Sequence, residues 1–323
     1  MIIPFWNILL ILATGPIGPV APRTAQPQST RSSQHSTWTS RSPLGSPRFG
    51  LSTSAVLGRI YAVGGYDGSS VFGDVDEYDS VSNTWTPRAS LPTARGYLAT
   101  AVVNDKLYSL GGFSAIGPTN LATVEEYDPW SDQWVPRSPM PTPRSWLASV
   151  AVQGKIYALG GYNGSWLGTV EEYDPATDIW TLRSPMPTPR ASLAAVATSG
   201  RIYAIGGHNG FDLSIVEEFD PLANTWRPRA PMQTARHGHA AAAVNGRIYV
   251  VGGYSIPNYV PATEGYAPAC NQWASYSNIP TPRAYLAATA LGGKVYAIGG
   301  FTYPTVRNTV ESFTPLLLVS CPP

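Results

Sequence analysis

Six arginines recur at a fixed place in the sequence, and their guanidinium groups are suited to binding carboxylates. Each arginine lies ten residues after a tryptophan and sixteen residues before a Gly-Gly pair. The six are Arg48, Arg95, Arg144, Arg190, Arg236 and Arg283. A guanidinium group can donate two parallel hydrogen bonds to one carboxylate. If these side chains surround one opening, they would suit a carboxylate, a sugar acid or an acidic peptide.

Aromatic side chains occupy two further repeated positions and could provide stacking surfaces beside the arginines. The residue after each Gly-Gly pair is aromatic or histidine: Tyr66, Phe113, Tyr162, His208, Tyr254 and Phe301. Two residues after each arginine, three units carry a bulky ring and three do not: Tyr97, Trp146 and Tyr285 against Gly50, Ser192 and Gly238. Because a uniform ring has no preferred side, we expect a ligand to lie off centre, toward Tyr97, Arg144, Trp146 and Tyr162.

The arginines have a second interpretation, in which they serve the structure alone. An acidic residue occupies a matching place later in every unit: Asp76, Glu125, Glu171, Glu217, Glu264 and Glu311. Six arginine–acid pairs could tie strands together within the units. The two interpretations are compatible if only some arginines are paired, and both remain open at this point.

Three of the four histidines fall close together in the same register and are candidates for a metal site. His237 and His239 follow Arg236, and His208 follows the Gly-Gly pair of the neighbouring unit. Zinc needs three or four ligands at about 2.0–2.1 Å, and the alternative is a set of hydrogen-bonded histidines. The sequence has no His-Glu-x-x-His, Gly-x-Ser-x-Gly or phosphate-loop motif. The residues therefore favour binding over catalysis, with no cofactor.

These positions repeat because the chain consists of six units of nearly equal length. The Gly-Gly pairs start at intervals of 46 to 49 residues. Each unit contains four short runs of β-branched, aromatic or small residues, separated by Gly, Pro and Asp-Pro turns, which is typical of strands. In the third unit we expect strands at 147–152, 156–159, 169–173 and around Trp180. No segment shows sustained helical periodicity.

The ends of the repeat indicate a closed ring. The sixth unit has a third strand at 309–313, but no tryptophan follows it, whereas Trp38 precedes the first arginine at the usual distance of ten residues. The segment around Trp38 therefore supplies the fourth strand of the sixth unit and removes the exposed sheet edges. The predicted fold is all-β, a six-bladed β-propeller. Antiparallel strands then place the arginines and the residues after the Gly-Gly pairs at one rim, here called the mouth.

The repeated unit resembles the kelch repeat. The residues that carry the resemblance are the Gly-Gly pair, a Tyr or Phe on the third strand, and a Trp seven residues later. These pairs are Tyr78/Trp85, Tyr127/Trp134, Tyr173/Trp180, Phe219/Trp226 and Tyr266/Trp273. The resemblance covers about residues 36–315 and implies the fold more than a function. Kelch propellers include peptide-binding adaptor domains, a copper radical oxidase and bacterial sugar mutarotases.

Two of these activities make demands that the residues can be checked against. The copper oxidase needs a Cys–Tyr crosslink at the mouth, whereas Cys270 is expected in a turn on the opposite rim, so that resemblance stops at the fold. A mutarotase requires little more than an acid–base pair in a polar mouth. Glu125 and Glu171 are candidates for the acid if they point into the channel.

Composition excludes several other classes of protein. Only 13% of the 323 residues are charged, and the net charge is +1. A nucleic-acid binder would show a basic surface, and a coiled coil would be far richer in charge. The 31 Gly and 31 Pro make up less of the chain than the roughly 25–30% of low-complexity sequences. A folded, aromatic-rich domain is the remaining class.

The N-terminal region differs from the repeats. Residues 1–20 resemble a signal peptide, because they are apolar and uncharged, although no Lys or Arg follows Met1. An overextended start or a tail packed on the domain are the alternatives. Residues 21–35 have the composition of a Ser/Pro/Gln-rich linker, and residues 36–323 form one propeller domain. We expect a secreted or cell-envelope protein, with a cytoplasmic one as the alternative; if exported, Cys270 and Cys321 could form a disulfide.

The sequence therefore predicts a monomeric, non-enzymatic binding module with a protein, peptide or carbohydrate ligand. The expected binding surface is the mouth, with its arginines and aromatic rings. Neither a nucleic-acid partner nor a transmembrane span is expected. A carbohydrate-active enzyme of the sialic acid or sugar mutarotase type is the alternative.

Overall fold

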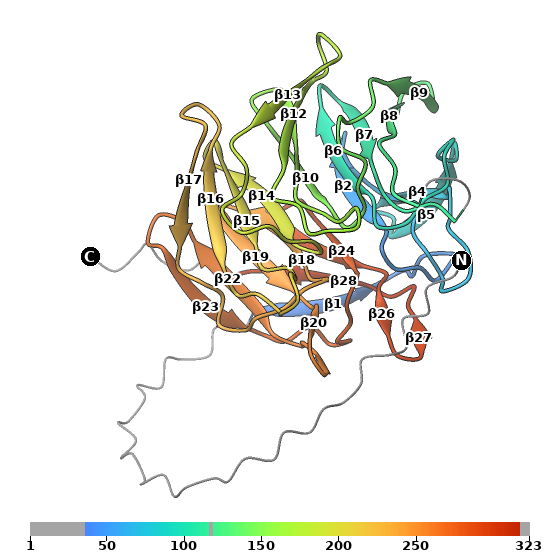
Figure 1. The fold of residues 1–323 in the computed structure, drawn as a ribbon. Helices are drawn as coiled ribbons and strands as arrows, with labels where there is room; N and C mark the ends of the chain where they lie inside the picture. The colour runs from blue at the N-terminus through green and yellow to red at the C-terminus, as the bar shows by residue number, and fades with distance from the viewer. Residues whose placement is uncertain (1–35, 116–118, 317–323) are drawn as a thin grey trace, which may run out of the picture. The chain divides into compact units, whose positions relative to one another are not determined.

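The computed structural model describes residues 36–115 and 119–316, and these residues form β-strands and no helix. The expected signal peptide, the whole of the expected linker segment and Cys321 lie outside them. The described strands form six antiparallel four-stranded sheets, the blades of the propeller (Figure 1). The first strands of the blades contact one another in a closed circle around the axis.

Each blade uses four strands of five residues. Blade one contains β2 (Ser52–Val56), β3 (Arg59–Val63), β4 (Val75–Asp79) and β5 (Thr84–Arg88). Blade two contains β6 (Ala99–Val103), β7 (Lys106–Leu110), β8 (Val124–Asp128) and β9 (Gln133–Arg137). Blade three contains β10 (Ala148–Val152), β11 (Lys155–Leu159), β12 (Val170–Asp174) and β13 (Ile179–Arg183). Blade four contains β14 (Ala194–Thr198), β15 (Arg201–Ile205), β16 (Val216–Asp220) and β17 (Thr225–Arg229). Blade five contains β18 (Ala240–Val244), β19 (Arg247–Val251), β22 (Thr263–Ala267) and β23 (Gln272–Tyr276). Blade six contains β24 (Ala287–Leu291), β25 (Lys294–Ile298), β28 (Val310–Thr314) and β1 (Thr37–Arg41). Two short hairpins, β20 (Tyr254–Ser255) with β21 (Asn258–Tyr259) and β26 (Phe301–Thr302) with β27 (Thr305–Val306), lie in the loops of blades five and six.

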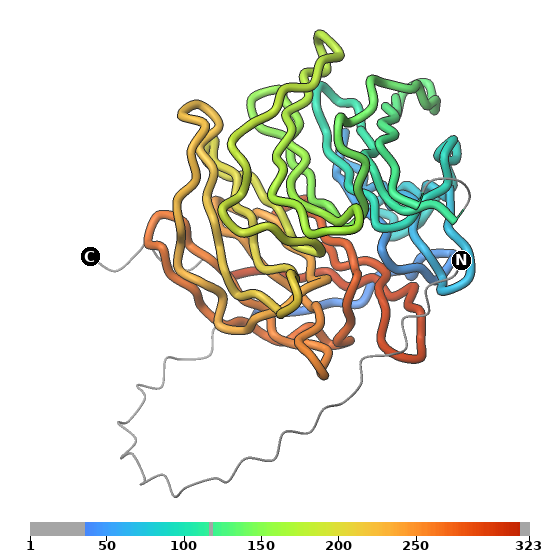
Figure 2. Tube along the Cα trace, in the orientation of Figure 1, coloured from blue at the N-terminus to red at the C-terminus, as the bar shows by residue number. Residues whose placement is uncertain are grey.

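Blade six joins the two ends of the repeat region, as the sequence predicts. The blue strand β1 lies beside the red strand β28 (Figure 2), and Trp38 stands opposite Phe313 in their register. The indole Nε1 of Trp38 donates a hydrogen bond to the Ser277 carbonyl of blade five at 2.9 Å. Trp180 makes the same bond from blade three to the Ser138 carbonyl of blade two. The prediction of a six-bladed propeller closed around Trp38 is confirmed.

The apolar core lies between neighbouring blades. Tyr173 of β12 is fully buried, with its ring 4.9 Å from that of Trp180 and 6.0 Å from that of Tyr108 in blade two. Its hydroxyl donates to Asp178, which also accepts the backbone N–H of Ser138 in blade two. Each blade is therefore joined to the preceding one by packed rings and by hydrogen bonds.

The Gly-Gly pairs allow two blades to approach closely. Gly160 has a φ of 59°, and a Cβ atom on it would lie 2.5 Å from the Arg190 carbonyl oxygen of the next blade. The N–H of Gly161 donates to that same oxygen at 3.0 Å. Any side chain at Gly160 would collide with the backbone, so glycine is required there.

The six arginines are fully buried, and each is paired with the acid on the third strand of its own blade. The closest N···O distances are 2.6 Å for Arg48–Asp76, 2.5 Å for Arg95–Glu125, 2.7 Å for Arg144–Glu171, 2.5 Å for Arg190–Glu217 and 2.5 Å for Arg283–Glu311, and Arg236 pairs with Glu264 in the same way. The strand-tie interpretation thus describes the observed contacts. The expectation that guanidinium groups line the mouth needs correction, because they turn inward to reach buried acids.

Arg144 shows what such a pair does within a blade. Its guanidinium donates to the Ala158 carbonyl of β11, to the Thr169 carbonyl before β12, and to the Glu171 carboxylate on β12. The hydroxyl of Thr142 donates to the other oxygen of Glu171 at 2.6 Å. Burial lowers the pKa of Arg144 to about 10, and the charge of Glu171 acts in the opposite direction. The guanidinium therefore stays protonated at neutral pH.

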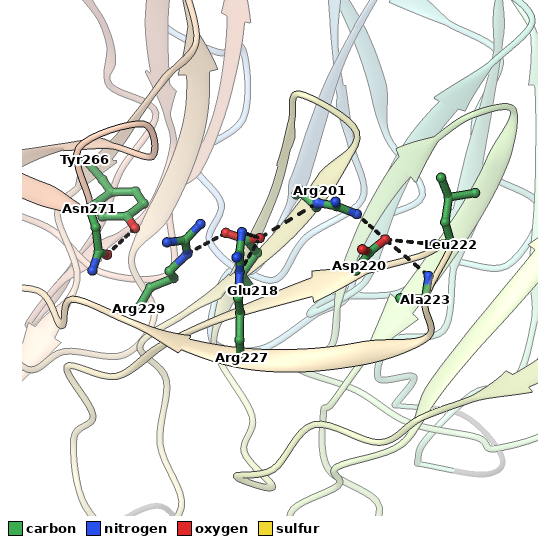
Figure 3. A network of polar contacts seen from close by, with 9 residues as sticks. All are labelled: Arg201, Glu218, Asp220, Leu222, Ala223, Arg227, Arg229, Tyr266 and Asn271. Carbon is green, nitrogen blue, oxygen red and sulfur yellow. Dashed lines mark hydrogen bonds and ion pairs between the residues drawn. The ribbon is translucent and has the colours of Figure 1, made fainter. Parts of the chain in front are cut away.

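A second set of charged contacts lies on the outer half of blade four (Figure 3). The carboxylate of Glu218 accepts hydrogen bonds from Arg229 at 2.5 Å and from Arg227 at 2.8 Å, and Arg201 lies 3.9 Å away. Burial alone would raise the pKa of Glu218, but the hydrogen bonds from Arg229, Arg227 and Tyr203 lower it overall. These charges tie the three outer strands of the blade to one another.

Breaking one buried arginine–acid pair should destabilise the fold. We expect Glu171→Gln to lower the free energy of unfolding by about 3 kcal/mol, because removing one partner of a buried ion pair costs about 3–5 kcal/mol. The double variant Arg144→Met/Glu171→Gln should recover part of that loss, since no buried charge is left unpaired. Urea unfolding measures both. The exposed Asp105→Asn is the control, and a Glu171→Gln protein as stable as this control would contradict the strand-tie role.

Candidate functional site

A ring of six backbone hydrogen bonds surrounds the propeller axis at the mouth. Its members are the residues two positions after the arginines: Gly50, Tyr97, Trp146, Ser192, Gly238 and Tyr285. From Tyr97 onward, the N–H of each member donates to the carbonyl of the preceding one at 2.6–3.0 Å, and the N–H of Gly50 donates to Tyr285 at 2.8 Å. All six residues have a positive φ, between 52° and 58°. The ring therefore fixes the same unusual backbone conformation in every blade.

The large and small residues of this ring are matched by packing. A Cβ atom on Gly50 would lie 2.7 Å from the Tyr97 ring, and one on Gly238 would lie 3.0 Å from the Tyr285 ring. Each tyrosine thus covers the glycine before it. A bulky residue with positive φ is rare and needs strong support from its surroundings, and here the hydrogen-bonded ring provides that support.

The axis itself holds only a small cavity of about 90 Å³. It is lined by the ring and by the residues that follow it: Leu51, Leu98, Leu147, Leu193, His239 and Leu286. Pockets that enclose small organic ligands have roughly 300–1,000 Å³. A ligand of that size therefore does not fit inside this cavity.

Aromatic rings form a connected surface around the mouth. On one side the ring centroids of Tyr97 and Trp146 are 4.9 Å apart, those of Trp146 and Tyr162 6.0 Å, and those of Tyr162 and Trp166 6.2 Å. On the other side Phe49 contacts Tyr66, Tyr97, Tyr285 and Phe301 at 5.2–6.3 Å. The structure thus brings Tyr97, Trp146 and Tyr162 together, whereas the buried Arg144 is not part of this surface.

The remaining predicted aromatic positions lie on the same rim. Each residue after a Gly-Gly pair forms a backbone bridge with the residue after an arginine: Phe49 with Tyr66, Gly96 with Phe113, Ser145 with Tyr162, Ala191 with His208, His237 with Tyr254 and Ala284 with Phe301. The ring of Tyr254 lies 5.7 Å from that of His237 and 5.1 Å from that of Tyr259. This backbone pairing fixes the backbone position of each of these aromatic or histidine residues at the rim.

The loops after the Gly-Gly pairs also carry exposed apolar side chains. Trp166, Phe211, Ile256 and Tyr303 belong to blades three to six and are 42%, 78%, 58% and 62% exposed. Single exposed apolar side chains are common on protein surfaces, whereas large contiguous patches of them mark interaction sites. Four of the six blades thus present an exposed apolar side chain in these loops.

The three candidate histidines do not lie in one cluster. His239 occupies the position of a leucine in the other blades, and its Nε2 lies 3.1 Å from the Ile205 carbonyl oxygen. Burial lowers the pKa of His239 to about 3, so its ring is neutral. The metal-site prediction therefore needs correction at this residue. His208 and His237 do approach each other, with ring centroids 5.1 Å apart.

A carboxylate that the sequence analysis did not select lies between these two histidines. Oδ1 of Asp212 is 2.5 Å from Nδ1 of His237 and 3.3 Å from Nδ1 of His208. Nε2 of His237 is 3.1 Å from the Tyr285 hydroxyl, so a hydrogen-bonded chain reaches the axial ring. Burial lowers the pKa of His237, and the hydrogen bond and charge of Asp212 oppose that shift. Burial raises the pKa of Tyr285, which keeps its hydroxyl protonated.

Two functional residues escaped the sequence analysis for different reasons. Asp212 stands in a loop of variable sequence, and its only signal is a position four residues after His208. Phe49 directly follows an arginine, at a place where the other units have Gly, Ser, Ala or His. Neither residue repeats, so the period that identifies the other positions cannot identify these.

The acids named for a mutarotase do not lie at the mouth. Glu125 and Glu171 are buried in the arginine pairs of blades two and three, so neither meets the condition of pointing into the channel. Cys270 is disulfide-bonded, and its expected partner Cys321 lies outside the described residues. The part of the chain that the structure describes contains no helix long and apolar enough to cross a membrane.

Comparisons with known proteins agree with this architecture. A model of the KLHDC2/KLHL20/DRC7 Kelch-repeats domain matches residues 28–161 and 130–253, and a Kelch motif model matches residues 235–277 and 282–316. The solved structure titled "Structure of YjhT" has a TM-score of 0.73 at 18% identity, and the match covers 84% of this chain and 95% of that one. No curated protein matches the sequence. The matched models span most of the repeats, and the chain belongs to the kelch-repeat family of β-propellers.

Proposed function

We propose that this protein is a binding module whose protein, peptide or carbohydrate ligand lies on the aromatic surface of the mouth. The observation that carries the proposal is the run of touching rings from Tyr97 through Trp146 and Tyr162 to Trp166. Aromatic rings supply a large contact area and pack against apolar faces of sugars and peptides. The hydrogen-bonded axial ring holds two of these rings in place before any ligand arrives, which lowers the ordering cost of binding.

The structure changes what kind of ligand the mouth suits. Because the six guanidinium groups are buried in ion pairs, recognition of a carboxylate by a ring of arginines is not part of the proposal. Stacking and apolar contact take its place, with the exposed Trp166 and Phe211 extending the surface over blades three and four. An off-centre ligand near Tyr97, Trp146 and Tyr162 remains the expected placement.

The placement can be tested with ring-removing variants in a glycan and peptide array, followed by affinity measurement for the best ligand. Trp146→Ser introduces the residue that blade four already has at that ring position, Ser192, and Tyr162→Ala removes the neighbouring ring. We expect each to weaken binding about tenfold or more, as loss of a central aromatic contact does. Trp130→Ser, at a 78% exposed tryptophan in the turn between β8 and β9, is the control. If Trp146→Ser and Tyr162→Ala both bind like the control, the placement is wrong.

A second candidate function is the mutarotase type, and one observation favours it. Asp212, His237 and Tyr285 form a hydrogen-bonded chain at the mouth, with groups that can accept and donate protons. Opening and closing a sugar ring requires proton transfer to and from oxygen atoms, which a positioned histidine can provide. This chain replaces Glu125 and Glu171 as the residues on which the alternative depends.

Anomeric equilibration of sialic acid, followed by NMR, separates the two candidates. A binding module leaves the rate unchanged when the protein is present in trace amounts, and this is the expected result. Acceleration that disappears in His237→Gln but persists in His239→Leu would instead establish the mutarotase candidate. His239→Leu is a matched control, because leucine is the residue of the other five blades at that position.

We further propose that the protein is exported and acts as a monomer outside the cytoplasm. The apolar, uncharged residues 2–20 support export, and so does the disulfide at Cys270, since disulfides persist in oxidising compartments. Cell fractionation with N-terminal sequencing is expected to find the protein outside the cytoplasm and beginning near residue 21. A full-length protein confined to the cytoplasm would contradict export.

A further inference from the structure

The cluster of His208, Asp212 and His237 brings three metal-ligating groups together at the mouth. One ring nitrogen of each histidine and a carboxylate oxygen of Asp212 all lie within 4.8 Å of one another. His208 and Asp212 come from the loop of blade four, and His237 comes from the start of blade five. The three side chains thus converge from two blades, although their positions in the sequence span 30 residues.

The spacing of these atoms is close to that of a metal site. Ligands at 2.0–2.1 Å from a tetrahedral zinc ion are about 3.3 Å apart. The Nδ1 atom of His208 is already 3.3 Å from Oδ1 of Asp212, and the Nδ1 atom of His237 is 2.5 Å from it. A shift of less than about 1 Å at His237 would therefore admit the ion. A donor set of two imidazoles and one carboxylate favours first-row transition metals over Mg²⁺ and Ca²⁺.

The groups behind the ligands are arranged to orient them. Oδ2 of Asp212 accepts the backbone N–H of Ile256 at 2.8 Å, which leaves Oδ1 directed at the histidines. The Tyr285 hydroxyl is 3.1 Å from Nε2 of His237, so that nitrogen has a hydrogen-bond partner when Nδ1 binds a metal. Metal-binding histidines and carboxylates usually have such supporting partners. Two of the three ligands, His237 and Asp212, thus have a supporting hydrogen bond, which favours a metal site over a chance cluster of side chains.

The cluster is largely buried, and His208 is its most exposed member. The side chains of Asp212 and His237 are each 10% exposed, whereas that of His208 is 28% exposed. Three protein ligands leave one position of a tetrahedral ion open. That position would face the mouth, where a water molecule or an oxygen atom of a bound ligand could occupy it.

We propose that His208, Asp212 and His237 form a binding site for a divalent first-row transition metal ion, of which zinc is the representative. The site does not depend on the binding function proposed for the aromatic surface. It involves none of the residues substituted to test that function, and it can be measured without any organic ligand.

Calorimetric titration of the full chain with Zn²⁺ tests the site, with Mg²⁺ as the comparison ion. The wild-type protein is expected to bind one Zn²⁺ and to show no heat with Mg²⁺. The ligand variants are His208→Gln, Asp212→Asn and His237→Gln, each of which should lower the affinity at least about 100-fold. Tyr285→Phe, which removes only a supporting hydrogen bond, should lower it by about 10–100-fold.

His239→Leu is the matched control, because it removes a histidine two residues from His237 that faces away from the cluster. This variant is expected to bind zinc like the wild type. Thermal unfolding of each metal-free protein checks that the variants are folded. Zn²⁺ should raise the melting temperature of the wild type and of His239→Leu equally, and should not raise that of the three ligand variants. The proposal is overturned if the wild type binds no zinc, or if folded His208→Gln and Asp212→Asn bind it as tightly as the control.

Discussion

The contact between each arginine and the preceding blade determines the rest of the structure. The carbonyl of Arg190 accepts a hydrogen bond from Gly161, and its N–H donates to the Leu167 carbonyl, so its backbone belongs to the interface with blade three. Its guanidinium turns the other way and binds the Ala204 carbonyl and the Glu217 carboxylate of blade four. One residue per unit thus joins two blades through its backbone and two strands of one blade through its side chain. This guanidinium is fully buried and so cannot contact a ligand at the mouth.

This division of roles explains where variation can occur. The residue two positions after the arginine enters the axial ring through its backbone alone, so its side chain is free to differ between Gly50, Ser192 and Trp146. The loops after the Gly-Gly pairs are likewise anchored by backbone bridges at their start. Side chains at both places therefore differ between blades, and within the ring the small Gly50 and Gly238 are matched to the large Tyr97 and Tyr285 that cover them. The proposed binding surface therefore consists of positions whose backbone the fold holds in place and whose side chains vary between blades.

The sequence predicts the fold well and the site only in part, for a physical reason. The period of the repeat specifies which residues occupy equivalent positions along the propeller axis and lie at the same rim. For this reason the closure by Trp38 and the convergence of Tyr97, Trp146 and Tyr162 could be predicted. The period does not specify whether a side chain at such a position points into its blade or toward the mouth. The arginines turn inward because buried acids and carbonyls lie within their reach. Asp212 could not be predicted because it lies in a non-repeating loop, whose path only the folded chain reveals.

Blade five shows how a small change in the repeat produces a distinct site. His237 and His239 are two residues apart, yet the ring residue Gly238 between them has a φ of 57°, which breaks the usual alternation of a strand. His237 consequently joins Asp212 and Tyr285 on the mouth rim, while His239 fills a leucine position beneath the ring. The rim histidine lies between the aromatic surface on blades two and three and the hairpins of blades five and six. A ligand that stacks on Trp146 and spans the mouth would therefore bring its polar groups toward the Asp212 cluster, which gives an otherwise apolar surface one directional contact.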